Sequence, residues 1–301
     1  IGIIAILLIP LTLTVIIISI LKKKIVQKKK FDVPIICVGN IYIGGTGKTP
    51  LSIFLGNELK KLGHNPAIVR KSYKTHADEH KMIKEKFESL ILCKNRILGI
   101  KNSLQANFDS IILDDGYQDQ SIKKDLNIIC FNQNQLVGNG MVMPSGPLRE
   151  SLKSLNEANI ILINGKKDKN FEEKILKINK NLEIFYSIYK PMNLEEFKNK
   201  RLFAIAGIGN PENFFKLIEE NNLKIEKRLI FPDHHIFSLP EVKKIEDEAR
   251  GNNCQIIMTE KDYFKIRDFN LENAKYLKIS LEIKEKNKLI NKINNLYAKK
   301  N

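Results

Sequence analysis

Tryptophan is absent from the 301 residues of this chain, and cysteine occurs only four times, at Cys37, Cys93, Cys130 and Cys254. No two cysteines have the short spacing of zinc ligands, which excludes a structural site built from cysteine pairs. Cys37 and Cys130 lie within apolar runs and are interpreted as small buried hydrophobic residues in a reducing compartment. Internal repeats are also absent, which excludes a solenoid of stacked repeats.

Charge is missing from the first part of the chain. Residues Ile1 to Leu21 contain no charged side chain and are almost entirely aliphatic. As one helix this run is roughly 30 Å long, which matches the hydrocarbon core of a bilayer. A buried core helix is the alternative, but such a helix usually carries a polar stripe. No small-x-small pattern follows the run, so an anchor is favoured over a cleaved signal peptide.

A basic cluster follows this apolar run directly. A cluster of this kind on one side of a hydrophobic span keeps that side in the cytoplasm. We therefore expect residues 1–30 to form a membrane anchor helix with a basic juxtamembrane segment. The lysines of the cluster are Lys22, Lys23, Lys24, Lys28, Lys29 and Lys30.

Acidic residues are fewer than basic ones, 34 against 50, and the formal net charge is +16. Such a surface favours nucleic acid, anionic lipid or a phosphorylated substrate as partner. The apolar run favours lipid among these, because each lysine near an anionic leaflet contributes on the order of 1 kcal/mol. The alternative is a lysine-rich composition whose charges only form a solvated face.

A glycine-rich segment between an apolar strand and an amphipathic helix carries the clearest chemical signal. It reads Gly44-Gly45-Thr46-Gly47-Lys48-Thr49, which is typical of a phosphate-binding loop (P-loop). Glycines let backbone N–H groups approach phosphate oxygens, and the helix N-terminus adds a favourable dipole. We expect Lys48 to reach the β- and γ-phosphates of ATP and the Thr49 hydroxyl to help hold Mg²⁺. Tyr42 replaces the first glycine of the usual pattern, so an ordinary strand–helix turn is the alternative.

Short apolar runs alternate with helical patterns from residue 31 onward, which predicts a doubly wound α/β sheet. A second series of this kind starts at Arg201. The expected fold is a P-loop NTPase-like domain over residues 31–190 and a smaller α/β domain over residues 191–301 that closes the site. The strands expected in the first series are Ile35–Val38, Ala67–Val69, Leu90–Leu92, Ser110–Leu113, Leu126–Phe131 and Ile160–Ile163.

Two acidic residues, Asp114 and Asp115, follow the apolar run Ser110–Leu113. A carboxylate at the end of a strand in this fold holds Mg²⁺ directly or through water. Two adjacent carboxylates also repel one another without a cation, which favours metal binding. The alternative is a polar turn or a helix cap, because aspartate is common at such junctions. The sequence does not separate the roles of Asp114 and Asp115.

Three further polar segments are candidates for substrate contact or catalysis. The loop Gly138–Glu150 carries Arg149, which is suited to clamp a phosphate or lies on the surface. Phe231-Pro232-Asp233-His234-His235 ends an apolar run, and one histidine beside an aspartate fits a general base, with metal binding or a helix cap as alternatives. In Thr259-Glu260-Lys261-Asp262, Lys261 faces a phosphate or the segment caps a helix.

In this order, and behind an apolar N-terminal run, these segments resemble the tetraacyldisaccharide 4′-kinase family. The resemblance covers essentially the whole chain and includes Gly207-Ile208-Gly209-Asn210-Pro211. It implies a P-loop kinase that uses ATP and Mg²⁺ to phosphorylate the 4′-hydroxyl of a tetraacyl disaccharide 1-phosphate, a lipid A precursor. It also implies a place at the cytoplasmic face of the bacterial inner membrane, with inner membrane lipids and not nucleic acid as partners.

The resemblance also assigns roles to residues. It implies that Asp78, in His76-Ala77-Asp78-Glu79-His80, pairs with His234 to activate the sugar hydroxyl, with Lys48 as the third catalytic residue. We further expect Asn139, Arg149 and Lys261 to bind the substrate. The chain departs from the family pattern over residues 70–74 and 119–121, so we expect either a different mode of acceptor binding or a slow enzyme.

The alternative function is a P-loop NTPase switch or partitioning module that binds membrane or nucleic acid and hydrolyses nucleotide without an acceptor. The net charge favours this function. The Asp-His-His segment, the Arg149 loop and the second domain do not, because a switch needs no groups for an acceptor.

Overall fold

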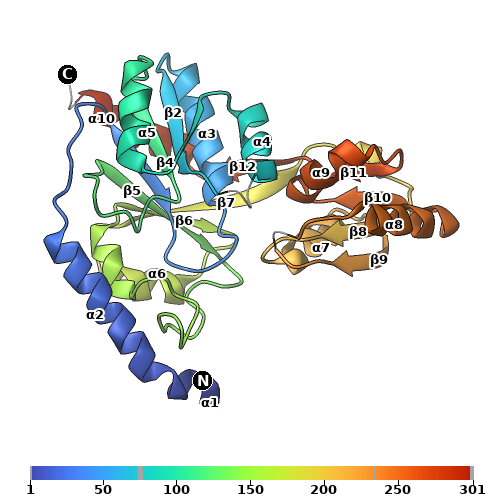
Figure 1. The fold of residues 1–301 in the computed structure, drawn as a ribbon, viewed down its shortest axis with the longest axis horizontal. Coiled ribbons are helices and arrows are strands. Elements are labelled where there is room, and N and C mark those ends of the chain that lie inside the picture. Colours follow the sequence, from blue (N-terminus) through green and yellow to red (C-terminus); the bar gives the residue numbers. More distant parts are fainter. Residues whose placement is uncertain (1, 74–76, 234, 299–301) are drawn as a thin grey trace. The chain divides into compact units, whose positions relative to one another are not determined.

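The computed structural model describes residues 2–73, 77–233 and 235–298, with the side chains of Ala77 and Asp78 outside the description. The chain forms two compact units (Figure 1). The larger unit comprises Ile1–Ser72, Ser89–Ile188 and Leu281–Asn301. The smaller unit comprises Tyr73–Glu88 and Tyr189–Ser280.

The apolar N-terminal run forms two helices, α1 (Ile3–Leu7) and α2 (Ile9–Ile25), instead of the single anchor helix that the sequence predicted. Pro10 lies in the first turn of α2, where it has no N–H to donate and its ring clashes with a continuous helix. Within the described residues, no helix has the length and apolar character needed to cross a membrane. The expected membrane-spanning helix is therefore corrected to this pair of shorter helices.

Helix α2 is attached to the larger unit at two points. The Thr12 hydroxyl is buried and donates a hydrogen bond to the Ser145 hydroxyl at 2.7 Å. Nearer its end, Lys23 Nζ lies 2.8 Å from Glu150 Oε2. Both partners belong to the loop Gly138–Glu150, so this loop holds the helix on the unit.

The sheet of the larger unit has the strand order β12-β7-β6-β5-β1-β4-β2-β3. Its central strands are apolar and buried on both faces, as expected for parallel strands covered by helices, and the buried Cys37 and Cys130 confirm their predicted place in the core. The strands are β1 (Ile35–Gly39), β2 (Pro66–Lys71), β3 (Leu90–Cys93), β4 (Ser110–Asp114), β5 (Leu126–Asn132), β6 (Ile160–Asn164), β7 (Glu183–Pro191) and β12 (Ile279–Ile283).

Helices pack against this sheet. Helix α3 contacts β1, β2 and β4, and α5 contacts β2 and β3. The helices of this unit, besides α1 and α2, are α3 (Lys48–Lys61), α5 (Arg96–Gln105), α6 (Lys169–Leu176), α10 (Lys286–Ala298) and the 3₁₀ helix η2 (Leu152–Glu157).

The smaller unit has its own parallel sheet, in the order β11-β10-β8-β9, and its own apolar core. Its strands are β8 (Leu202–Ala206), β9 (Ile225–Ile230), β10 (Gln255–Met258) and β11 (Ala274–Tyr276). Its helices are α4 (Ala77–Lys86), α7 (Pro211–Glu220), α8 (Leu239–Gly251) and α9 (Glu260–Ile266), with the 3₁₀ helices η3 (Leu194–Glu196) and η4 (Arg267–Phe269).

Two helices lie in a different unit from the one that the expected boundaries, 31–190 and 191–301, assign to them. Helix α4 belongs to the smaller unit, because it packs on α9, where Lys86 pairs with Glu260. Helix α10 belongs to the larger unit, because it packs on α3, where Lys286 Nζ lies 2.7 Å from Glu58 Oε2. These long-range contacts have no signature in the local sequence, so the expected division is corrected for both segments.

Candidate active site

The glycine-rich segment runs from the end of β1 to the start of α3, as predicted for a phosphate-binding loop. Gly44 and Gly47 have φ angles of 118° and 87°, in the left-handed region that favours glycine. Helix α3 begins at Lys48, directly after Gly47. Its free N–H groups and dipole therefore face the loop, which makes this position suitable for an anion.

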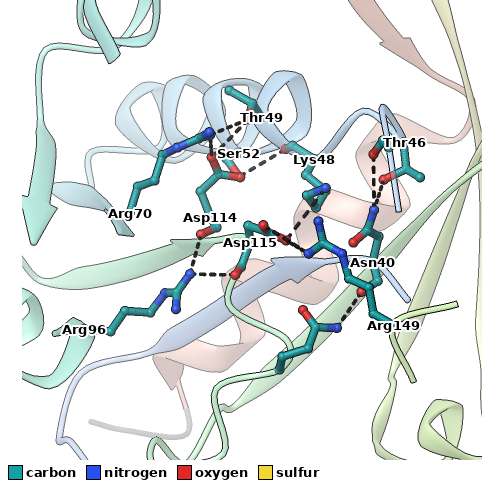
Figure 2. Close-up of polar contacts among 12 residues, drawn as sticks. Asn40, Thr46, Lys48, Thr49, Ser52, Arg70, Arg96, Asp114, Asp115 and Arg149 are labelled. Atoms are coloured by element: carbon teal, nitrogen blue, oxygen red, sulfur yellow. Dashed lines mark hydrogen bonds and ion pairs between the residues drawn. The ribbon is translucent and has the colours of Figure 1, made fainter. Parts of the chain in front are cut away.

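Thr49, in the first turn of α3, joins the loop to β4. Since β1 and β4 are parallel and Val38 is in register with Asp114, the carboxyl ends of both strands meet at one edge of the sheet. The Thr49 hydroxyl donates to Asp114 Oδ2 at 3.0 Å, and the Ser52 hydroxyl donates to Oδ1 at 3.1 Å (Figure 2). Asp114 is completely buried.

Arg70, near the end of β2, completes the surroundings of Asp114. Its Nη1 donates to Asp114 Oδ2 at 2.5 Å and to Thr49 Oγ1 at 2.8 Å. Its side chain is 11% exposed. Arg70 was not among the predicted site residues, although its position at a strand end on this edge of the sheet was a usable signal.

Asp115 has different surroundings from Asp114. Its φ of 52° is unusual for a residue with a side chain and turns it away from the strand direction. Arg149 Nη1 lies 2.9 Å from its Oδ1 and 3.2 Å from its Oδ2, and Lys48 Nζ lies 3.7 Å from Oδ1 (Figure 2). Burial raises the pKa of the Asp115 carboxyl, but the charges of Lys48 and Arg149 outweigh this effect and lower the pKa below its ordinary value.

Arg96, the first residue of α5, fixes the backbone of the acidic pair. Its Nη2 donates to the carbonyl of Asp115 at 2.6 Å and to that of Asp114 at 3.3 Å. Arg96 is buried and was not among the predicted site residues, because its contacts with the backbone of both aspartates have no local sequence signature.

The Thr49 hydroxyl and the Asp114 carboxylate fit the preference of Mg²⁺ for oxygen ligands. The described residues contain no cluster of three acidic, histidine or cysteine side chains that could hold a metal alone. This agrees with the chemistry of Mg²⁺ in kinases, where water and phosphate oxygens supply most of the ligands. Asp114 is the aspartate that contacts Thr49, whereas Asp115 faces Lys48 and Arg149; each carboxylate also has at least one cationic neighbour.

The loop Gly138–Glu150 contains two residues assigned to the substrate. Arg149 reaches the site through its contact with Asp115. Asn139 is engaged within its own loop, where Nδ2 donates to the carbonyl of Ser145 at 2.9 Å and Oδ1 accepts from the N–H of Met141 at 3.0 Å. The loop thus brings Arg149, but not the Asn139 side chain, to the acidic pair.

The segment Thr259–Asp262 in the smaller unit shows the helix cap that was one of its two interpretations. Thr259 is the N-cap of α9, and its hydroxyl oxygen accepts from the N–H of Asp262 at 3.2 Å. Lys261 Nζ lies 2.9 Å from Asp233 Oδ1. Lys261 is therefore joined to the Asp-His-His segment.

The structure describes only part of the residue pair that is expected to activate the acceptor. His234 lies outside the described residues, and Asp78 is described by its backbone alone, in the first turn of α4. The neighbouring His235 is engaged elsewhere, with Nε2 2.9 Å from Glu241 Oε2 and its ring stacked on Phe231.

Comparison with known proteins identifies the family. A family model for tetraacyldisaccharide-1-P 4′-kinase (LpxK) matches residues 4–298. The tetraacyldisaccharide 4′-kinase of Pelagibacter ubique (strain HTCC1062) is 38% identical over 282 residues, which cover 92% of this chain and 90% of that protein. The enzyme of the same name from Francisella tularensis subsp. novicida (strain U112) is 33% identical over 298 residues, which cover 87% and 90%.

A solved structure shows the same fold. LpxK from Aquifex aeolicus, crystallised in complex with ATP, matches with a TM-score of 0.75 and 21% identity over 97% of this chain and 99% of that one. The family that the sequence motifs predicted is thereby confirmed, and the switch without an acceptor is set aside. The chain belongs to the tetraacyldisaccharide-1-P 4′-kinase family and is a kinase of lipid A biosynthesis.

Proposed function

We propose that the larger unit binds ATP with Mg²⁺ and that the chain transfers the γ-phosphoryl group to the 4′-hydroxyl of a tetraacyl disaccharide 1-phosphate. The observation that carries this proposal is the contact of Thr49 with Asp114, which joins the phosphate-binding loop to the acidic strand end in a chain of this family. The loop binds phosphate oxygens through its N–H groups, and Thr49 and Asp114 hold Mg²⁺. When bound, Mg²⁺ neutralises charge on the β- and γ-phosphates.

Lys48 and Arg149 act on the transferred group in this proposal. Both cations face Asp115, so a carboxylate now occupies the place between them. The γ-phosphate of a bound nucleotide also brings negative charge to this place, where it can contact Lys48. The bidentate geometry of Arg149 suits a phosphate as well as a carboxylate.

The smaller unit supplies the groups for the acceptor. Asp78 orients His234, and His234 takes the proton of the 4′-hydroxyl as its oxygen attacks phosphorus. Support comes from the described neighbours of both residues: α4 packs on α9, and Lys261 of α9 pairs with Asp233. The two segments therefore belong to one unit, and Lys261 is suited to hold an anionic group of the substrate. Asn139 supports the substrate through its loop.

The N-terminal helices attach the enzyme to the cytoplasmic face of the bacterial inner membrane. Helices α1 and α2 expose an unusually long series of large apolar side chains, which favours burial in the interfacial layer of a bilayer. Attachment brings the active site near a lipid substrate. The exposed apolar residues are Ile3, Ile4, Ile6, Leu7, Leu11, Leu13, Val15, Ile17, Ile18, Ile20, Leu21 and Ile25.

Transfer of ³²P from labelled ATP to tetraacyl disaccharide 1-phosphate in detergent tests the proposal. We expect transfer by the intact chain and losses of at least about a hundredfold in Lys48→Ala and His234→Ala. Lys101→Ala, a change at an exposed lysine of α5, serves as the control and should transfer normally. ATP hydrolysis without transfer would overturn the proposal in favour of a switch. Normal phosphate transfer by His234→Ala would contradict the role of His234 as the base.

A further inference from the structure

The residues that follow the acidic pair contact the end of β1 and the residue after it. Gly39 lies against Tyr117 so closely that a Cβ at position 39 would be 2.4 Å from the Tyr117 Cβ. One residue later, Gln118 Nε2 donates to the backbone carbonyl of Asn40 at 2.8 Å. The glycine that precedes the phosphate-binding loop is therefore required by packing, and the acidic segment is joined to the start of the loop.

The Asn40 side chain continues this connection into the loop. It is completely buried, and its Nδ2 donates to Thr46 Oγ1 at 2.9 Å and faces the carbonyl of Gly44 at 3.5 Å (Figure 2). A carbonyl oxygen only accepts hydrogen bonds, so the amide nitrogen and not the amide oxygen must point to this side. The contact with Gly44 thereby fixes the direction of the bond to Thr46.

This direction determines what the Thr46 hydroxyl can do. A hydroxyl group has one proton, and a hydroxyl that accepts from Asn40 keeps this proton for another acceptor. Thr46 lies in the phosphate-binding loop and is buried. A phosphate oxygen is an acceptor only, so a Thr46 hydroxyl oriented in this way is ready to donate to it.

The oxygen of the Asn40 amide shows what this orientation costs. Its Oδ1 is buried and has no hydrogen-bond partner among the described residues. Buried polar atoms are nearly always paired, and the exceptions call for an explanation. The contacts of the amide nitrogen with the loop fix the orientation of the Asn40 side chain, and in this orientation the amide oxygen has no partner among the described residues.

We propose that Asn40 and Gln118 are positioning residues for nucleotide binding. Gln118 holds the backbone of Asn40, and Asn40 orients the Thr46 hydroxyl as a donor to a nucleotide phosphate. The same chain of contacts keeps the loop in register with Asp114 and Asp115. This inference rests on the proposed binding of nucleotide by the loop, but not on the identity of the acceptor.

Binding of ADP with Mg²⁺ to the full chain, measured by calorimetry, tests this proposal. Loss of one buried hydrogen bond to the loop in Asn40→Ala should weaken binding about tenfold. Thr46→Val should weaken binding to the same extent, and the double variant should bind within about twofold of the singles, since both remove one interaction. Gln118→Ala should show a smaller loss of about threefold. Additive losses, or normal binding by Asn40→Ala, would overturn the proposal.

A matched asparagine separates positioning from folding. Asn127, near the start of β5, donates to the carbonyl of Glu157 at 2.9 Å. Asn127→Ala should lower the melting temperature without changing ADP affinity. Equal losses of ADP affinity in both alanine variants at equal melting temperature would overturn the proposal.

A second comparison applies if Asn40→Ala does not fold. Thr46→Ser keeps the hydroxyl and should bind ADP within about threefold of the parent, whereas Thr46→Val should not. Equal binding by the serine and valine variants would overturn the proposal. A chain that shows the expected ADP binding but transfers no phosphate to the disaccharide would contradict the proposed acceptor and leave this inference standing.

Discussion

Nη1 of Arg70 lies 2.5 Å from Oδ2 of Asp114, and the same nitrogen lies 2.8 Å from the Thr49 hydroxyl. One guanidinium nitrogen therefore contacts both groups that are proposed to hold Mg²⁺. Asp114 is completely buried, and a buried carboxylate needs a compensating positive charge. Arg70 supplies this charge.

Arg70→Ala should strongly destabilise the chain in metal-free buffer. Removal of one partner from a buried ion pair leaves the other charge uncompensated and costs about 3–5 kcal/mol. The free energy of unfolding, measured with urea in EDTA, checks this expectation. Lys288→Ala is the control, because it breaks an exposed ion pair with Glu285 and should cost less than about 1 kcal/mol. Equal effects of the two changes would contradict the importance of the Arg70 charge.

Asp115 makes the stability of the chain depend on pH. Its pKa in the folded state is lowered, so its ionised form stabilises the fold above the unfolded pKa of about 3.9. This stabilisation is lost as the pH falls through the lower pKa of the folded state. The difference in unfolding free energy between the parent and Asp115→Asn should therefore shrink from pH 7 to about pH 3. A difference that grows as the pH falls would contradict the lowered pKa of Asp115.

The local sequence predicted the parts of the site that depend on neighbours in the chain. The glycine-rich loop, the strand before Asp114 and the order of strands and helices follow from patterns of a few residues. The sequence did not separate Asp114 from Asp115, because their different surroundings arise from the backbone turn at Asp115 and from the contacts of Arg70 and Arg149. None of these features has a signature in the residues beside the pair.

The N-terminal run shows a different limit. Its composition predicted one spanning helix, although Pro10 was visible in the sequence as a possible interruption. The bond between Thr12 and Ser145 joins segments far apart in the chain. Composition alone therefore could not show that a face of α2 is held by the larger unit.

Asp262 is expected to be essential for the stability of the smaller unit. Its buried carboxylate accepts from the N–H of Gly207 at 2.7 Å, the Thr259 hydroxyl at 2.6 Å and Lys265 Nζ at 2.9 Å. Asp262→Ala leaves the nearly buried Lys265 without the carboxylate of its ion pair, with the Gly207 carbonyl at 3.4 Å remaining, and should cost about 3 kcal/mol. Hydrogen exchange should then become faster at Gly207, while amides in the larger unit keep their rates. Uniformly faster exchange in both units would show instead that the units unfold together.

The exposed lysines in the last turn of α2 and just after it are expected to strengthen membrane binding. Lys22, Lys24, Lys28 and Lys30 are exposed, whereas Lys23 is paired with Glu150. Each lysine near an anionic surface contributes about 1 kcal/mol, so their joint replacement by glutamine should weaken binding to anionic vesicles by a hundredfold or more at low salt. ADP affinity should not change.

Four exposed lysines of the smaller unit provide the control for this experiment. Replacement of Lys216, Lys224, Lys243 and Lys244 by glutamine changes the net charge by the same amount. If net charge alone drives vesicle binding, this control loses as much affinity as the N-terminal variant. If the proposed attachment through α2 is correct, the control binds nearly as the parent does, and added salt lowers the affinity of the parent toward that of the N-terminal variant.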